Sequence, residues 1–440
     1  MRSELLSLSN RISKARHKVG KTWDRLTNIG RSPERDAYAV HNRAMEHHNA
    51  GRHKDALEDY ARALELMPDD PYALRNRGLL LYELERHDEA LSDLARSLYL
   101  RERYNPEHPD TLKEKGEFYC RAERYEDAVA VYNRALQLVP KQPEVLQRRG
   151  IALNRLGFYE DALADFSEAY RLSPGLPESL RLRASVLEQM GRYGEAVGDL
   201  SRCIELRPDD ATLYKLRGEI EEASGNVEAA TSDFCRAFNL EPDSEYYCSL
   251  CCRLLVNRRR NDEAYALFMR LLERTSTLGS YASALLGIVY IRMERFDEAL
   301  TLLDSALALD PRDKLLLLVR ASALHITRRY AEAIADFTAC LEIDDTYANA
   351  LAGRAVAHAR LGNVQQARDD MSRAEELRPD DPSNFYNWAC FHAVTSDTSA
   401  AIEALKVAVE RNPQFRSDAE SDPDFESLRQ DSRFSDILAK

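Results

Sequence analysis

The chain has 440 residues, of which 44% are hydrophobic, so it can bury a large core in a water-exposed protein. Its formal net charge of −13 argues against nucleic acid as the main ligand. Eight cysteines in so long a chain do not suggest the disulfide framework of a small secreted domain. The sequence has no secretory signal pattern and no apolar run long enough to cross a bilayer, so we expect a cytoplasmic protein.

The first segment, residues 1–36, differs from the rest of the chain in charge. Residues 1–35 hold nine Lys and Arg against three Asp and Glu, and a heptad-like apolar stripe runs through them from Leu5 to Ile29. We predict one or two amphipathic helices that cap the fold. The alternatives are self-association through the stripe and contact of residues 1–30 with an anionic membrane surface.

From residue 37 onward, a pattern recurs about every 34 residues. Each period contains an alanine followed by a bulky residue four positions later, and in all but one period by a small residue seven positions later, which places them on one helix face. One longer gap falls in residues 101–109, where we expect a longer loop, and one extra residue falls near 274–280. The register alanines are Ala56, Ala90, Ala128, Ala162, Ala196, Ala230, Ala264, Ala299, Ala333, Ala367 and Ala401.

Each period predicts two helices joined by a turn. In one period Gly150 allows close helix contact, Gly157 breaks the chain between the helices, and Pro174 stops the second helix. The predicted units are residues 37–70, 71–108, 109–142, 143–176, 177–210, 211–244, 245–279, 280–313, 314–347, 348–381 and 382–415.

The tail, residues 416–440, predicts further capping helices. Asp422 and Asp431 can each cap a helix. Apolar residues follow these two aspartates and would cover the open apolar face of the last unit, as a terminal unit requires. These residues are Phe425, Leu428, Phe434, Ile437 and Leu438.

The pattern over residues 37–415 resembles the tetratricopeptide-repeat (TPR) family. The resemblance implies an all-α fold, a right-handed α-solenoid of about 11 helix-turn-helix units with N- and C-terminal capping helices. It also implies a non-enzymatic scaffold that binds partner proteins or extended peptides in a concave groove lined by the first helices. The alternatives are a membrane-peripheral assembly factor that uses the basic N-terminal helix and a regulatory subunit of an enzyme complex.

The resemblance further implies which first-helix positions face the groove. These positions are charged or polar in the first six units and apolar in units seven to ten. Apolar groups that face water often form a binding surface, and the alternative is packing between neighbouring helices. The candidate peptide-binding residues are Asn42, Tyr72, Arg75, Asn76, Lys113, Arg121, Arg148, Arg155, Arg181, Lys215, Tyr281, Leu285, Ile288 and Ile291.

An arginine recurs one residue before the small first-helix position in seven units. Such a row could bind an acidic peptide. We favour a structural role in which each arginine stem lies along the helix pair and its head binds loop carbonyls. The seven are Arg43, Arg77, Arg149, Arg183, Arg217, Arg320 and Arg354.

Some members of the family bind the C-terminal carboxylate of heat-shock chaperones through Lys, Asn and Arg side chains of consecutive first helices. Asn76 matches that pattern here. Asp110 and Glu114 stand where cations are needed and would repel a carboxylate, so we do not expect a chaperone partner of this kind.

Cysteine and histidine clusters give only weak metal signals. Cys248, Cys251 and Cys252 form a single CxxCC cluster with Cys235 nearby, whereas structural zinc needs four ligands. We predict that these cysteines are buried as small apolar side chains. Three histidines also lack the order of a metalloprotease motif: His47, His48 and His53. We predict no catalytic residue, cofactor or metal.

Overall fold

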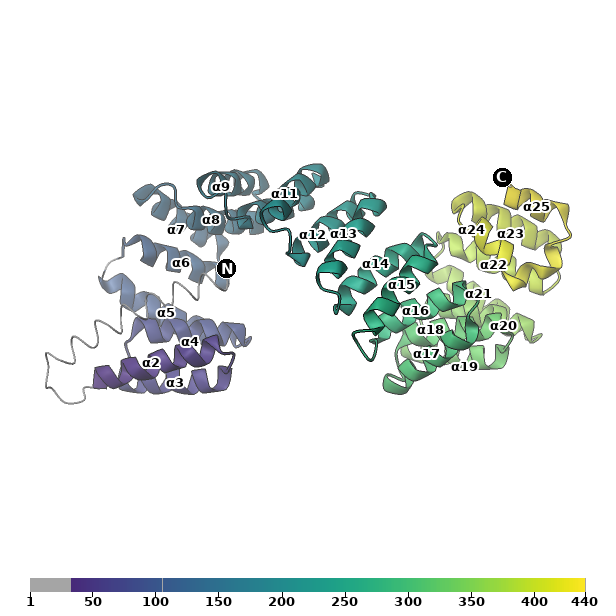
Figure 1. Ribbon diagram of the computed structural model, residues 1–440, viewed down its shortest axis with the longest axis horizontal. Coiled ribbons are helices and arrows are strands. Elements are labelled where there is room, and N and C mark those ends of the chain that lie inside the picture. Colours follow the sequence, from purple (N-terminus) through teal and green to yellow (C-terminus); the bar gives the residue numbers. More distant parts are fainter. Residues whose placement is uncertain (1–32, 105, 440) are drawn as a thin grey trace. The chain divides into compact units, whose positions relative to one another are not determined.

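The computed structural model describes residues 33–104 and 106–439, and all of these residues lie in helices or short connections (Figure 1). The expected all-α repeat fold is confirmed. The predicted N-terminal segment lies almost entirely outside the described residues. Helices α2 to α23 form consecutive pairs, with each even-numbered helix first and the following odd-numbered helix second.

The first helices are twelve, thirteen or seventeen residues long. They are α2 (Pro33–Asn49), α4 (Pro71–Glu83), α6 (Pro109–Arg121), α8 (Pro143–Arg155), α10 (Glu178–Gln189), α12 (Ala211–Ala223), α14 (Glu245–Asn257), α16 (Ser280–Arg292), α18 (Lys314–Ile326), α20 (Ala348–Arg360) and α22 (Pro382–Val394).

The second helices carry the register alanines near their starts. They are α3 (His53–Leu66), α5 (His87–Tyr104), α7 (Tyr125–Leu138), α9 (Tyr159–Leu172), α11 (Tyr193–Leu206), α13 (Val227–Leu240), α15 (Asn261–Leu272), α17 (Phe296–Leu309), α19 (Tyr330–Ile343), α21 (Val364–Leu377) and α23 (Thr398–Arg411).

The core of each pair is built from the predicted small and bulky positions. Every register alanine is completely buried, and the bulky residue four positions later is at most 9% exposed. A Cβ placed on Gly150 would lie only 2.8 Å from Cε1 of Phe166, so glycine is needed where α8 crosses α9. The alternation of small and large residues therefore sets how closely the two helices pack.

The turn inside each pair has a residue in the left-handed region five positions before the register alanine. Gly157 has φ of +81° there, as the sequence predicts for a chain-breaking glycine. Six pairs have a residue other than glycine at this position, all with φ between 55° and 65°: Glu85, Glu123, Arg259, Glu294, Arg328 and Ser396.

The insertion in residues 101–109 lengthens a helix, so the expectation of a longer loop is wrong. Helix α5 has 18 residues, and only residues 105–108 separate it from α6. No helix-breaking residue occurs before Pro106, and the extra turn is held by α6. Arg101 pairs with Glu114, and Lys115 Nζ lies 2.5 Å from Glu102 Oε1. The extra residue near 274–280 does lie in a longer connection, between α15 and α16.

The contacts divide the chain into residues 1–206 and 207–440, which we call the N-terminal body and the C-terminal body. The C-terminal body ends in α24 (Phe415–Ser421), a 3-10 helix η1 (Pro423–Leu428) and α25 (Ser432–Ala439), which pack beside α22 and α23 (Figure 1). Asp422 caps η1, as predicted, by accepting a hydrogen bond from the Asp424 N–H at 2.9 Å. Asp431 likewise accepts from the Arg433 N–H.

The predicted apolar residues of the tail cover the last unit. Phe425, Leu428 and Phe434 are at most 3% exposed and belong to one cluster with α22 and α23. Ile437 and Leu438 pack against the same cluster. The terminal cap of the C-terminal body is thereby confirmed.

The cysteines differ from the prediction at one place. Cys235 of α13 and Cys251 of α14 form a disulfide, so they do not both pack as free thiols. Cys248 and Cys252 are buried free thiols, as predicted. In the described part of the chain, no helix has the length and apolar content that a bilayer-crossing segment requires.

Candidate functional site

The seven recurrent arginines are bound within their own helix pairs. Each donates hydrogen bonds of 2.5–2.8 Å to an aspartate sixteen residues later, on the second helix. The structural role is therefore correct, but the expected partner is wrong, because the guanidinium heads bind carboxylates and not loop carbonyls. The partners are Asp59, Asp93, Asp165, Asp199, Asp233, Asp336 and Asp370.

These pairs are the main electrostatic feature between the two helices of a unit. Asp165 is 5% exposed, and burial of such a carboxylate requires a cationic partner. The hydrogen bonds that Arg149 donates to Asp165 raise the pKa of Arg149 against the effect of burial. In the units that lack the arginine the aspartate is absent too, as at Leu286 and Leu302.

Several predicted groove residues of the N-terminal body pair with glutamates of neighbouring first helices. Arg75 Nε lies 3.3 Å from Glu114 Oε1, and Arg148 Nη2 lies 3.2 Å from Glu117 Oε1. A third pair joins Lys113 Nζ to Glu144 Oε2 at 3.2 Å. Their charges are therefore largely neutralised inside the protein, which reduces what they offer to an acidic ligand.

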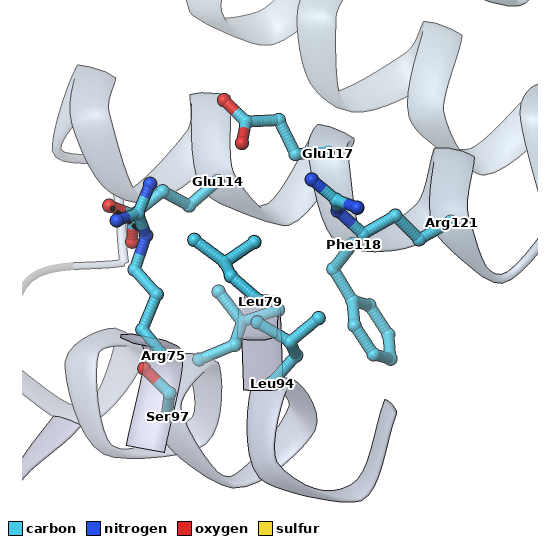
Figure 2. A pocket seen from close by; sticks show the side chains of 9 residues that line it. Arg75, Leu79, Leu94, Ser97, Glu114, Glu117, Phe118 and Arg121 are labelled. Carbon is cyan, nitrogen blue, oxygen red and sulfur yellow. Dashed lines mark ion pairs between the residues drawn. The ribbon is translucent and has the colours of Figure 1, made fainter. Parts of the chain in front are cut away.

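The junction of α4, α5 and α6 contains a small pocket among these residues. Figure 2 shows Arg75 and Glu114 close together at one side, Leu79 and Leu94 in the middle, and Phe118 with Arg121 at the other side. The cavity measures about 20 Å³, which is room for roughly one water molecule. This pocket is too small to be a ligand site.

The other polar candidates of the N-terminal body have different environments. Asn76 is bonded to the buried His41 through a 2.9 Å contact between Nδ2 and Nε2. Arg121 lies over the Tyr82 ring, 4.7 Å from its centroid, and Arg181 donates to Glu178. Among the described residues, the exposed Asn42 and Arg155 make no side-chain hydrogen bond or ion pair.

The apolar candidates of the C-terminal body are mostly packed. Leu285 is only 6% exposed, so its assignment as an exposed groove residue is wrong. Ile288 and Ile291 are partly buried and pack against the cluster formed by α16 to α22. Lys215, a charged candidate in the same body, pairs with Glu219 on its own helix, with 2.9 Å between Nζ and Oε2. Among the described apolar candidates of the C-terminal body, only Tyr281 remains largely exposed.

Four exposed tyrosines occupy one equivalent repeat position. Each lies 18 residues before the register alanine of its unit, near the start of a first helix. Their exposed fractions range from 47% to 60%. Tyr38 and Tyr72 lie on consecutive first helices of the N-terminal body, and Tyr246 and Tyr281 on consecutive first helices of the C-terminal body. Their repeated spacing was a signal in the sequence, although Tyr38 and Tyr246 were not among our candidates.

A second, larger pocket lies in the C-terminal body beneath the tail. It has a volume of about 480 Å³ and is lined by the ends of first helices and by α24 and η1. Ile291, a predicted groove residue, belongs to its wall. The tail is fixed around it by ion pairs from Arg259 to Asp418, from Arg328 to Glu426 and from Arg360 to Asp424.

Two aspartates anchor this wall: the half-buried Asp422, which caps η1, and the buried Asp424 within η1. Burial opposes the charge of Asp424, but His325 and Arg360 outweigh it and lower its pKa. Burial raises the pKa of Asp422, and the neighbouring Asp424 charge adds to the effect. Asp422 accepts a hydrogen bond from Tyr386 Oη at 2.8 Å, and this bond and the nearby His325 only partly offset the effect of burial. The surroundings of Asp424 thus favour its charged form, whereas those of Asp422 favour its neutral form.

Two groups bring possible metal-ligand atoms within 4.8 Å of one another. One is His48, His53 and Glu83, and the other is Cys390, Asp422 and Asp424. His48 Nε2 already contacts Glu83 Oε2 at 2.9 Å. The hydrogen bonds described above likewise account for both aspartates, so the second group needs no ion to satisfy its carboxylates. In the first group, His53 Nδ1 is buried and has no hydrogen-bond partner among the described residues.

Comparison with known families is consistent with this repeating geometry. Three tetratricopeptide-repeat family models match residues 46–85, 69–141 and, in three segments, 119–177, 181–239 and 284–348. Together these matches cover more than half of the chain. The chain belongs to the tetratricopeptide-repeat family. Tetratricopeptide-repeat proteins mediate protein–protein interactions and are typically non-enzymatic scaffolds.

Individual similarities to other tetratricopeptide-repeat proteins are low. The chain is 28% identical over 137 residues to RNA polymerase II-associated protein 3 of Mus musculus; the match covers 31% of this chain and spans about a fifth (19%) of that relative. It is similar to the Cut9–Hcn1 structure at 13% identity, covering 93% of this chain and 98% of that one with a TM-score of 0.43. It is similar to the yeast Tom70 structure at 16% identity, and this match covers 92% of this chain and 99% of that one with a TM-score of 0.39.

The sequence analysis missed the arginine–aspartate pairs and the tail pocket for different reasons. The pairs leave a direct signal, because every recurrent arginine has an aspartate sixteen residues later. The pocket leaves none, because Arg259 and Asp418 are 159 residues apart and meet only when the tail folds back.

Proposed function

We propose that this chain is a scaffold that binds extended peptide segments of partner proteins through the exposed tyrosines of its first helices. The observation that supports this is the recurrence of Tyr38, Tyr72, Tyr246 and Tyr281 at one repeat position with large exposed fractions. Tyrosine offers a large contact area at little cost in side-chain entropy, and its hydroxyl can donate or accept. It is enriched among the residues that dominate binding energy.

The neighbouring side chains favour peptide backbone over acidic side chains as the ligand. The cations Arg75, Lys113 and Arg148 are already paired with glutamates of adjacent first helices. Asn42 lies one helical turn after Tyr38 and, among the described residues, has no hydrogen-bond partner, so its amide can bond a peptide group. Rigid helices hold these groups in place before binding, which lowers the ordering cost.

Selection of displayed random peptides against the full chain tests this proposal. The selected peptides are then offered to a variant with Tyr38→Ala, Tyr72→Ala, Tyr246→Ala and Tyr281→Ala. Tyr99→Ala is the matched control, because Tyr99 is 66% exposed but lies on the second helix α5. The proposal expects retention by the control and loss from the fourfold variant; equal retention by both would contradict it.

A cytoplasmic location and a role as a regulatory subunit remain predictions. The same holds for membrane contact or self-association through residues 1–30, which lie outside the described residues. Deletion of this segment followed by liposome flotation and light scattering would separate these two alternatives from peptide binding.

A further inference from the structure

The pocket beneath the tail has the size of a ligand site. Its volume of about 480 Å³ falls within the range of small-molecule pockets. Phe296, Ile326 and Val356 give it an apolar part, and Arg259, Arg292 and His325 give it a polar part. All of its lining residues belong to the C-terminal body.

The polar part contains buried atoms without hydrogen-bond partners. Within the described residues, Arg259 Nε, Asn261 Oδ1 and His325 Nδ1 are buried and make no hydrogen bond. All three residues line the pocket. An unpaired buried polar atom costs free energy, so a concentration of three in one pocket indicates that a polar ligand belongs there.

The cations of the pocket have spare donors, whereas its buried anions are satisfied. Arg292 is exposed and lines the pocket, and among the described residues its side chain donates a hydrogen bond only to the backbone carbonyl of Val256. Burial, together with the nearby Arg259 charge, lowers the pKa of Arg292, as expected where two guanidinium groups lie close together.

The carboxylates around the pocket, in contrast, already have donors. Asp418 accepts from Arg259, and Asp424 from Arg360 and His325. Asp422 accepts from Tyr386 and from the Asp424 N–H. Glu294, on the exposed turn before α17, is the remaining acidic lining residue. Arg259 Nε therefore lacks an acceptor, whereas Asn261 Oδ1 lacks a donor, and neither need is met by these carboxylates.

We propose that this pocket binds the carboxylate or phosphate group of a small polar ligand, with Arg259 and Arg292 as the anion-binding residues. Arginine donates two parallel hydrogen bonds to either group. Asn261 and His325 would contact the polar remainder of the ligand, and the apolar wall would contact its carbon atoms. This site is separate from the tyrosines of the peptide surface.

Calorimetric titration of the full chain with inorganic phosphate and with succinate tests the site and distinguishes its two anion chemistries. Arg259→Gln and Arg292→Gln should each weaken binding of the preferred probe about tenfold or more. Arg328→Gln is the matched control, because Arg328 occupies the equivalent turn position to Arg259 and also pairs with the tail, through Glu426, but does not line the pocket.

The outcomes are distinct. Binding of either probe that is lost in Arg259→Gln and Arg292→Gln and kept in Arg328→Gln supports the site. Circular dichroism of each variant shows whether the fold is retained, and Arg292→Gln removes no ion pair. Failure of both probes to bind the unaltered chain at millimolar concentration would overturn the proposal, as would binding that is unchanged in Arg292→Gln.

Discussion

Arg149 of α8 and Asp165 of α9 form two parallel hydrogen bonds, from Nε to Oδ2 at 2.8 Å and from Nη2 to Oδ1 at 2.6 Å. This relationship recurs in seven helix pairs at a spacing of sixteen residues. The two-point geometry fixes the rotation of each first helix against its partner, in addition to the apolar packing. The arginines therefore stabilise the units and are not free to bind a ligand.

Removal of Arg149 alone should lower the free energy of unfolding more than removal of both Arg149 and Asp165. Arg149→Leu leaves Asp165 buried without a cation, and we expect a loss of about 2 kcal/mol in the free energy of unfolding. Adding Asp165→Leu should restore most of it, since the unit with Leu286 and Leu302 has apolar residues at both positions. Urea unfolding of both variants checks this; a double variant less stable than Arg149→Leu would contradict it.

Glycine should stabilise the turns that now hold a glutamate in the left-handed region. Glu85 and Glu123 have φ of 60° and 55°, a conformation costly for residues with a Cβ. We expect Glu85→Gly and Glu123→Gly each to raise the free energy of unfolding by about 1 kcal/mol. Gly157→Ala, at φ of +81°, should lower it by a similar amount. Equal midpoints for all three would show that the turn conformation is wrong.

Asp422, the cap of η1, and Asp424, within η1, should respond to replacement by asparagine in opposite directions. The pKa of Asp422 is raised, so its contribution to stability is present below about pH 4 and is lost as pH rises through that pKa. Asp422→Asn keeps an acceptor for Tyr386 without a charge. We therefore expect it to be neutral or stabilising by about 1 kcal/mol at pH 7.

Asp424→Asn should destabilise the tail. The pKa of Asp424 is lowered, so its contribution is present above about pH 4 and is lost as pH falls through the folded pKa. The variant leaves Arg360 without its carboxylate and should lose about 2 kcal/mol at pH 7, with a smaller loss in acid. Thermal unfolding of both variants at pH 7 and pH 3 is the measurement. The same sign of effect for the two variants at pH 7 would refute this assignment.

Reduction should destabilise the C-terminal body. The Cys235–Cys251 bond closes a loop with a sequence separation of 16, and a loop of this length contributes about 3 kcal/mol through the unfolded chain. We expect dithiothreitol or Cys235→Ser to lower the unfolding midpoint, and Cys340→Ser to have no redox-dependent effect because Cys340 is a free thiol. Peptide mapping without reductant checks that the bond is formed; its absence would contradict the structure here.

The repeating part of the fold could be predicted from the sequence, because small and bulky residues recur at fixed spacings within each unit. Ala162, Phe166 and Gly150 predict the close contact between α8 and α9 that the structure shows. The prediction of a longer loop at residues 101–109 failed, because a count of extra residues cannot distinguish a longer loop from an extra helical turn. The Cys235–Cys251 bond was also missed, since spacing alone does not bring two sulfur atoms together.

The candidate binding residues were less predictable than the fold. Family geometry places a residue on a helix face but does not say whether its neighbour neutralises it, as Glu114 does for Arg75. Nor does it say whether neighbouring helices cover it, as happens to Leu285. The tail pocket depends on contacts between Arg259 and Asp418, which no repeat period encodes.

The dissociation constant of a selected peptide for the unaltered chain and its tyrosine variants tests the central claim most directly. Peptide recognition through first-helix tyrosines predicts that either Tyr38→Ala with Tyr72→Ala or Tyr246→Ala with Tyr281→Ala weakens binding by about tenfold or more. Tyr99→Ala should leave the constant unchanged. Equal dissociation constants for the unaltered chain and both double variants would contradict the account.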